Sequence, residues 1–157
     1  MNYPIKLDSI DKKILEILQK DGNITNAQLA KEIGLSPAPT LERVKKLEQA
    51  KLIKSYHAKL DTANLGLGVT TFLLITLSSH KINQINTFVE KITTLDEVME
   101  CYHITGSGDF LVKILVEDIA TYHKLILEKL TQIEEVGNMS SMIVLYNYKD
   151  DAIIKIK

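Results

Sequence analysis

Residues 25–48 read TNAQLAKEIGLSPAPTLERVKKLE, and this stretch carries the signals of two short helices joined by a tight turn. Thr25 can cap the first helix, and Gly34 follows its last apolar residue, where a glycine commonly ends a helix. Ser36 and Pro37 then mark the start of the second helix, because serine is a good cap and proline fits the first helical position. The stretch therefore predicts a helix-turn-helix.

Another helix precedes this pair. Isoleucine and leucine recur at helical spacing from Ile10 to Leu18, and Asp8 stands where it can cap their helix. After the pair, residues 52–60 alternate only roughly between apolar and polar side chains, which predicts a connecting strand. We therefore expect three helices followed by one extended segment.

The rest of the chain alternates between strand and helix patterns. Strand patterns cover residues 69–77, 98–105, 110–116 and 139–148, and helix patterns cover residues 82–92 and 119–133. The order strand-helix-strand-strand-helix-strand is that of a ferredoxin-like domain. The expected fold class is α+β: a three-helix, winged-type helix-turn-helix domain (1–52), a connecting strand or linker (53–66) and a ferredoxin-like domain (67–157).

The composition is that of an ordinary globular protein, with 45% hydrophobic and 25% charged residues. The single Cys101 excludes an intrachain disulfide, and the four histidines are too scattered for a structural zinc site, so we expect no metal. The sequence has neither the pattern of a signal peptide nor an apolar run of membrane-spanning length. We therefore expect a cytoplasmic protein without a membrane partner.

The net charge of −1 conceals two unlike halves. Residues 1–60 carry 11 basic and 7 acidic side chains, a net charge of +4, whereas the remaining residues carry 8 and 13, a net charge of −5. Such asymmetry indicates that the N-terminal half approaches a polyanion. Chance is the other explanation, because a small surplus of lysine is common in small domains.

The second helix of the quoted pair carries the candidate DNA-contacting residues, because the major groove admits one helix. Exposed positions near its start can reach base edges, its N-terminus favours a phosphate, and its basic side chains can reach phosphates. A three-helix module that binds another protein is the alternative, since basic residues on a helix surface are usually only solvated. The candidates are Ser36, Pro37, Ala38, Leu41, Glu42, Arg43, Lys45 and Lys46.

A second candidate site lies at Gly106-Ser107-Gly108-Asp109, between two predicted neighbouring strands. Its glycines permit positive backbone angles and close approach of another group. An aspartate beside exposed backbone N–H groups can bind the ammonium and the carboxylate of a free amino acid. A β-hairpin whose glycines and aspartate only form the turn explains the same residues. The segment lacks the GxGxxG spacing, so we expect no nucleotide cofactor.

Catalysis has weaker support. Cys101 and His103 share one face of a predicted strand, as a nucleophile and its base would. No third group that would orient this pair is identifiable, and a buried thiol beside a surface imidazole explains both residues. Tyr146 and Tyr148 also share a face and are expected to pack. We therefore expect no catalytic residue, and a small enzyme that uses the 106–109 turn is the weakest of the hypotheses.

The stretch from Gly34 to Glu48 resembles the recognition-helix region of the Lrp/AsnC, or feast/famine, transcription regulators. Leu7-Asp8-Ser9-Ile10-Asp11 resembles the start of the same domain, and Thr105 to Phe110 is similar to the family's glycine-aspartate turn. The resemblance extends from about Lys6 to Tyr148. It implies a regulator that binds double-stranded DNA as a homodimer, whose C-terminal domain assembles dimers, often into octamers, with free amino acids as effectors.

The resemblance also implies which residues contact the effector: Gly106, Ser107, Gly108 and Asp109 in the turn, and Met139 and Ser141 on the last strand. Two positions depart from the family. Ala50-Lys51 stands where a glycine is common, so we expect a turn of different shape, and Thr40 replaces an apolar residue, which we expect to loosen the contact between the paired helices. An architectural protein that wraps DNA without responding to a ligand is the alternative function.

Overall fold

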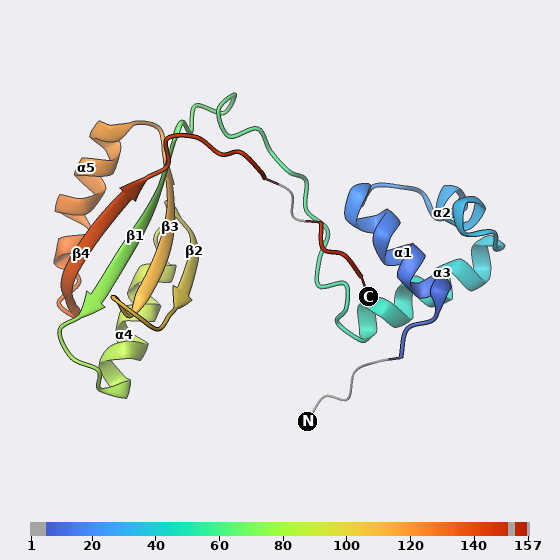
Figure 1. Cartoon of the computed structure of the whole chain (residues 1–157), viewed down its shortest axis with the longest axis horizontal. Helices are drawn as coiled ribbons and strands as arrows, with labels where there is room; N and C mark the ends of the chain where they lie inside the picture. Colours follow the sequence, from blue (N-terminus) through green and yellow to red (C-terminus); the bar gives the residue numbers. More distant parts are fainter. Residues whose placement is uncertain (1–5, 151–152, 157) are drawn as a thin grey trace. The chain divides into compact units, whose positions relative to one another are not determined.

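The computed structural model describes residues 6–150 and 153–156 and divides into two compact units (Figure 1). The first unit comprises the chain up to Leu60 together with the residues from Lys149 onward, and the second is Asp61–Tyr148. The sequence interpretation had assigned the whole C-terminus to the second domain. The last residues return to the first unit instead, so two chain segments join the units.

Three helices form the first unit, at the places that the sequence predicts: α1 (Ser9–Lys20), α2 (Asn26–Ile33) and α3 (Pro37–Gln49). Each helix turns an apolar stripe toward a common core. The buried side chains of this core are Ile14, Leu29, Ile33 and Leu47.

Capping residues explain where these helices begin and end. The side chains of Asp8 and Thr25 each accept a hydrogen bond from the backbone N–H three residues further on, in two capping boxes. Gly34 ends α2 with φ 76°, a left-handed conformation that glycine adopts without strain. Lys51, after α3, also has a left-handed φ of 56° although it carries a side chain. The strain that a glycine would relieve therefore falls on Lys51.

The connecting strand expected at residues 52–60 is not formed, and this prediction was wrong. Residues 54–60, all of which the structure describes, have irregular backbone and belong to neither a helix nor the sheet. A strand is stabilised by the hydrogen bonds of its ladder, and the four-stranded sheet is built entirely from the second unit. Rough alternation in the sequence is therefore not enough to make a strand here.

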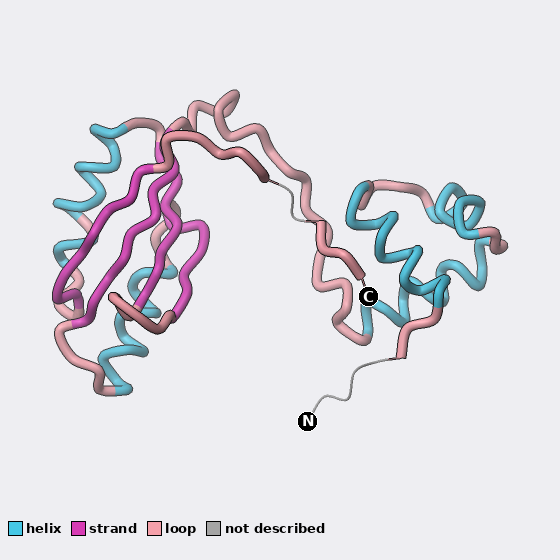
Figure 2. Tube along the Cα trace, in the orientation of Figure 1, coloured by secondary structure: helices cyan, strands magenta, loops and turns pink. Residues whose placement is uncertain are grey.

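The second unit has the predicted order of elements. Its strands are β1 (Val69–Leu77), β2 (Val98–His103), β3 (Phe110–Val116) and β4 (Val136–Ile143), and its helices are α4 (Ile82–Thr93), α5 (Ile119–Glu128) and the short 3-10 helix η1 (Leu130–Gln132). The strands form one antiparallel sheet in the order β2-β3-β1-β4 (Figure 2). This is the ferredoxin-like arrangement, so the expected fold class is confirmed.

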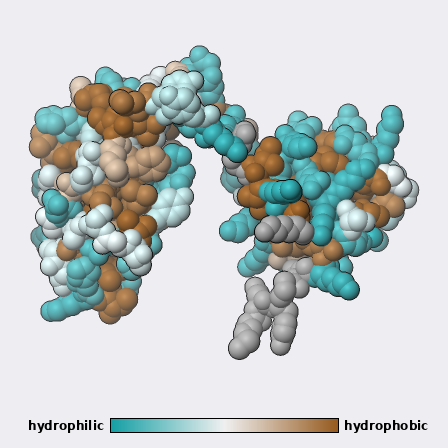
Figure 3. Space-filling view, viewed as in Figure 1, coloured by the Kyte–Doolittle hydropathy of each residue, from teal (hydrophilic) through white to brown (hydrophobic). Residues whose placement is uncertain are grey.

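Alternation along the two central strands explains the core of this unit. Every second side chain of β1 from Thr71 to Leu77, and of β3 from Phe110 to Val116, is buried, and they pack with residues of α4 and α5. The side chains between them, among them Phe72 and Leu74, are only half-buried. Figure 3 shows hydrophobic residues (brown) gathered over this unit. The sheet thus keeps an apolar surface that its own helices do not cover.

The last strand spans 136–143 rather than the expected 139–148. Its pairing ends where the Val144 N–H donates to the Thr70 carbonyl oxygen at 2.9 Å, because β1 itself begins at Val69. Tyr146 and Tyr148 were expected to pack in the sheet, but they are 70% and 92% exposed. Their rings contact each other edge to face instead, with centroids 4.6 Å apart.

Candidate DNA interface and effector site

Backbone contacts and one side-chain amide set the turn between α2 and α3. The Leu35 N–H donates to the Ala30 carbonyl oxygen at 2.9 Å and closes α2 around Gly34. Asn26, at the start of α2, donates through Nδ2 to the Pro37 carbonyl oxygen at 2.8 Å. This bond ties the first turn of α3 to α2. The sequence interpretation missed Asn26, because nothing in the local pattern indicates that its amide reaches another helix.

Thr40 does not loosen the contact between the helices. Its side chain is fully buried, and its hydroxyl donates to the Ser36 carbonyl oxygen at 2.9 Å. The polar group is therefore satisfied within α3, and it leaves no unpaired hydroxyl between the helices.

The opposite face of α3 is open to solvent. Leu41 is 43% exposed, whereas the large aliphatic residues that follow it in α3, Val44 and Leu47, are half-buried and buried. Within the described residues, the Ser36 hydroxyl makes no capping hydrogen bond, so it is not engaged by the helix. The predicted DNA-contacting residues that are exposed are Ser36, Pro37, Ala38, Leu41, Glu42, Lys45 and Lys46.

Arg43 differs from the other predicted contacts. Its Nη1 lies 2.7 Å from Asp8 Oδ2 and 2.7 Å from Asp11 Oδ1, and its side chain is 32% exposed. The Asp11 backbone N–H, followed by Arg43, lowers the pKa of Asp8, and the two carboxylates raise the pKa of Arg43. The guanidinium therefore joins α3 to the start of α1 and does not point freely to solvent.

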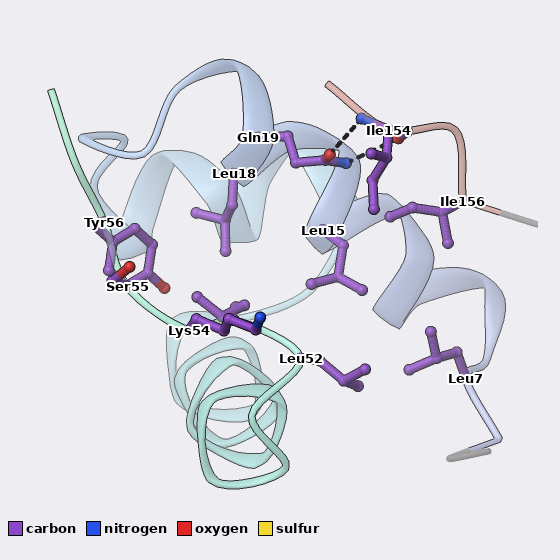
Figure 4. A pocket seen from close by; sticks show the side chains of 11 residues that line it. Leu7, Leu15, Leu18, Gln19, Leu52, Lys54, Ser55, Tyr56, Ile154 and Ile156 are labelled. Carbon is purple, nitrogen blue, oxygen red and sulfur yellow. Dashed lines mark hydrogen bonds between the residues drawn. The ribbon is translucent and has the colours of Figure 1, made fainter. Parts of the chain in front are cut away.

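A pocket of about 450 Å³ lies beside α1 in the first unit (Figure 4). Leucines of α1 and of the segment after α3 line it, together with Ile154 and Ile156 of the C-terminal tail. The Gln19 amide accepts a hydrogen bond from the Ile154 N–H at 2.8 Å and donates to the Ile154 carbonyl oxygen at 3.3 Å. The side chain of Gln19 therefore pairs with the tail as a neighbouring peptide group would.

In the second unit, Asp109 is built into the sheet. Its backbone N–H donates to the Ile75 carbonyl oxygen at 2.9 Å, and its Oδ2 accepts the Leu77 N–H at 2.8 Å. The carboxylate thus continues the β1–β3 ladder beyond the first residue of β3. The side chain is 19% exposed, and the Leu77 amide and the nearby imidazoles lower the pKa of Asp109. It is therefore more than a turn former, since it also holds the end of β1.

His80, in the loop after β1, is the other partner of this carboxylate. Its Nε2 lies 2.9 Å from Asp109 Oδ1, and its side chain is 66% exposed. The sequence interpretation missed this residue, because His80 and Asp109 are far apart in the sequence and no motif links them. Of the remaining turn residues, Gly106 and Ser107 are exposed, whereas Gly108 is buried against the side chain of Leu74.

The two candidates on β4 lie apart from the turn. Met139 pairs with Ile75 across the β1–β4 ladder, whereas Asp109 bonds to Ile75 from the β3 side, so a whole strand separates them. Ser141 is engaged through its Oγ, which lies 2.6 Å from the Tyr122 hydroxyl of α5. Within one chain, the structure brings Gly106–Asp109 together with His80 and does not bring Met139 and Ser141 to the same place.

Cys101 and His103 do not make a nucleophile-base pair. Cys101 is half-buried against the core, and burial raises the pKa of its thiol, which disfavours the reactive thiolate. His103 stacks on Phe110 with ring centroids 4.7 Å apart. Among the described residues, no group of three or more His, Cys, Asp and Glu side chains is placed to hold a metal ion. No helix in the described part of the chain is long and apolar enough to cross a membrane.

A three-helix unit with one exposed helix, linked to a separate ferredoxin-like unit, is the arrangement of a helix-turn-helix DNA-binding protein with a second domain. Comparison with protein families supports both parts. Residues 7–54 match the winged helix-turn-helix DNA-binding family, and residues 70–154 match the Lrp/AsnC ligand binding domain. The chain therefore belongs to the Lrp/AsnC family of transcription regulators.

Individual relatives agree with this assignment over nearly the whole chain. The transcriptional regulator AzlB of Bacillus subtilis is 39% identical over 92% of this chain and 92% of its own length. The leucine-responsive regulatory protein of Escherichia coli K12 is 39% identical over 96% of this chain and 92% of its own length. Among solved structures, a Neisseria meningitidis transcriptional regulator in complex with L-Met has a TM-score of 0.91 and 30% identity, over 96% of this chain and 97% of that chain.

Proposed function

We propose that this regulator reads a specific DNA site with α3 and changes its DNA binding when an amino acid binds at the Gly106–Asp109 turn. The exposed face of α3 is the observation that carries the proposal. We propose that base edges are contacted by Ser36, Ala38, Leu41 and Glu42, a phosphate by the helix start at Pro37, and flanking phosphates by Lys45 and Lys46. The exposure of these residues supports the proposal. Arg43 has a different role in this proposal, because it holds α3 against α1.

Two copies of the chain are part of the proposal. A half-buried apolar surface over the sheet is a surface that a second copy would cover, and two recognition helices related by a two-fold axis fit two half-sites. We infer homodimers that assemble further into octamers. Size-exclusion chromatography with light scattering tests the assembly, and a monomer at micromolar concentration would contradict it.

The proposed effector is a free amino acid. Two relatives support this class of ligand, because one is solved as a complex with L-Met and another is named as leucine-responsive. In this chain, Asp109 Oδ1 is the candidate for the ammonium group, and the backbone of Gly106, Ser107 and Gly108 for the carboxylate. Met139 and Ser141 lie across β1, so they would serve a ligand held between two copies.

Selection of binding sites from random duplex DNA tests the proposal, when it is carried out with the purified full chain, with and without a mixture of the twenty amino acids. Enrichment of a pseudo-palindromic sequence supports a site-specific regulator, and a change of enrichment or affinity on adding amino acids supports the effector. Salt-sensitive binding to all DNA without enrichment contradicts the proposal and favours the architectural, DNA-wrapping alternative.

A further inference from the structure

Both oxygens of the Asp109 carboxylate have partners within the chain. Its Oδ2 accepts the Leu77 N–H, a backbone bond that the end of β1 needs, while its Oδ1 lies 2.9 Å from His80 Nε2. The two oxygens are therefore unequal. Oδ2 is fixed by the sheet, whereas the hydrogen-bond partner of Oδ1 among the described residues is the mostly exposed side chain of His80, which lies in a loop.

An incoming ammonium group needs the same oxygen. A carboxylate oxygen attracts any nearby cation, and two cations that share it repel each other. Histidine is the side chain whose charge ordinarily changes between pH 5 and 8. A neutral imidazole gives up Oδ1 at the loss of one hydrogen bond, whereas an imidazolium gives up an ion pair and then stands beside a second positive charge.

We propose that His80 is a pH-dependent competitor of the effector, which occupies Asp109 Oδ1 and must be displaced by the ammonium group of the bound amino acid. The inference rests on the proposed function, because it concerns the same turn. It adds a residue to the effector site that lies outside the Gly106–Asp109 turn, and it makes the amino-acid response of this regulator weaker in acid.

The other charged groups around this loop do not provide the same switch. Asp109 itself stays ionised across this pH range, since its pKa lies below the ordinary value of 3.8. His103 is close enough to Asp109 to contribute to that lowering, but its ring stacks on Phe110. Glu135 contacts this loop through its carbonyl oxygen, which accepts the Ser78 N–H at 2.9 Å, and its carboxylate is paired with Lys91 at 2.8 Å. His80 is the imidazole in direct contact with the carboxylate.

Calorimetric titration of the full chain with L-leucine and with L-methionine tests the inference at about pH 5.5 and about pH 8.0. Histidine ordinarily gains its charge between these two pH values, and exclusion of the ligand by a cationic His80 is expected to weaken binding about tenfold at the lower pH. His80→Asn removes the titrating cation, so its affinity is expected to change less than about twofold. His80→Lys supplies a permanent cation and is expected to bind weakly at both pH values. His123→Asn, an exposed histidine of α5, is the control and is expected to keep the tenfold change.

The outcomes separate the inference from the proposed function. Binding of either amino acid with the same affinity at both pH values overturns the inference and leaves the effector site standing. An equal pH dependence of binding in the wild type and in His80→Asn also overturns the inference. Another group would then cause the pH dependence, and His103 would be the first to test. If neither amino acid binds the wild type or His80→Asn at either pH, the inference is overturned, whereas the effector proposal fails only if the site selection with all twenty amino acids also shows no response.

Discussion

Arg43 and Lys46 lie one turn apart on α3, yet their surroundings predict that only Lys46 contributes to the salt dependence of DNA binding. Lys46 is exposed, whereas the Arg43 guanidinium is held by Asp8 and Asp11 at 2.7 Å each. Each lysine or arginine that neutralises a phosphate contributes about −0.9 to the slope of log K against log salt. Lys45 and Lys46 therefore give α3 an expected slope of about −1.8 per protomer, and Arg43 adds nothing.

The test compares Arg43→Gln with Lys46→Gln, which remove the same charge one turn apart. Fluorescence anisotropy with a labelled duplex carrying the selected site gives the affinity between about 50 and about 200 mM salt. Lys46→Gln is expected to make the slope less negative by about 0.9 per protomer, and Arg43→Gln to leave it unchanged. Arg43→Gln is instead expected to lower the unfolding temperature, because it leaves Asp8 and Asp11 without their shared cation. A change of about 0.9 for Arg43→Gln, equal to that of Lys46→Gln, would refute the assignment.

Three further predictions concern single contacts. Lys51→Gly is expected to stabilise the chain by about 0.5–1 kcal/mol, because relief of a left-handed backbone (roughly 1–2 kcal/mol) exceeds the added entropy of glycine in the unfolded chain (roughly 0.5–1 kcal/mol). Calorimetry should show a higher unfolding temperature for Lys51→Gly and a lower one for Lys54→Gly, whose φ is not positive; no increase for Lys51→Gly contradicts the account. Because the folded pKa of Asp109 is lowered, its ionised form contributes stability that is complete above about pH 4 and is lost as the pH falls further. The wild type should therefore lose more stability than Asp109→Asn in urea unfolding below pH 4, and parallel curves would contradict this. Gln19→Ala removes both hydrogen bonds to Ile154, so exchange of the Ile154 amide hydrogen should speed up about tenfold, and unchanged exchange would show that the tail is held by other contacts.

Most of the architecture could be predicted from the sequence, because it depends on local signals. Asp8, Thr25 and Gly34 act at helix ends within a few residues of themselves, and they do so in the structure as predicted. Apolar, strand-like patterns placed β1 and β3 at their observed bounds. The exposed face of α3 also follows from the spacing of its apolar residues, so most of the candidate DNA-contacting residues could be named in advance.

The predictions that failed concern strands and long-range partners. Residues 52–60 alternate roughly between apolar and polar side chains but have no partner strand in the sheet. β4 ends at Ile143 because β1, its partner strand, begins near this point and has no earlier residues to pair with it. A strand's length is decided by its neighbour, and the neighbour is distant in the sequence. The exposure of Tyr146 and Tyr148 is a consequence of that early end.

The sequence by itself determined where the helices begin, the order of elements and the residue types that α3 presents to DNA, since each of these is set by backbone capping and periodicity over one or two turns. It did not determine the end of α5, which stops at Glu128 and not at the predicted residue 133. Only the tertiary structure decided which charged side chains are exposed to solvent and which are held in ion pairs. Arg43 and Lys46 are equivalent cations in the sequence, and they differ because the fold brings Asp8 and Asp11 beside one of them. Asp109 and His80 form a site for the same reason: a carboxylate acquires a function from the groups that the fold places around it.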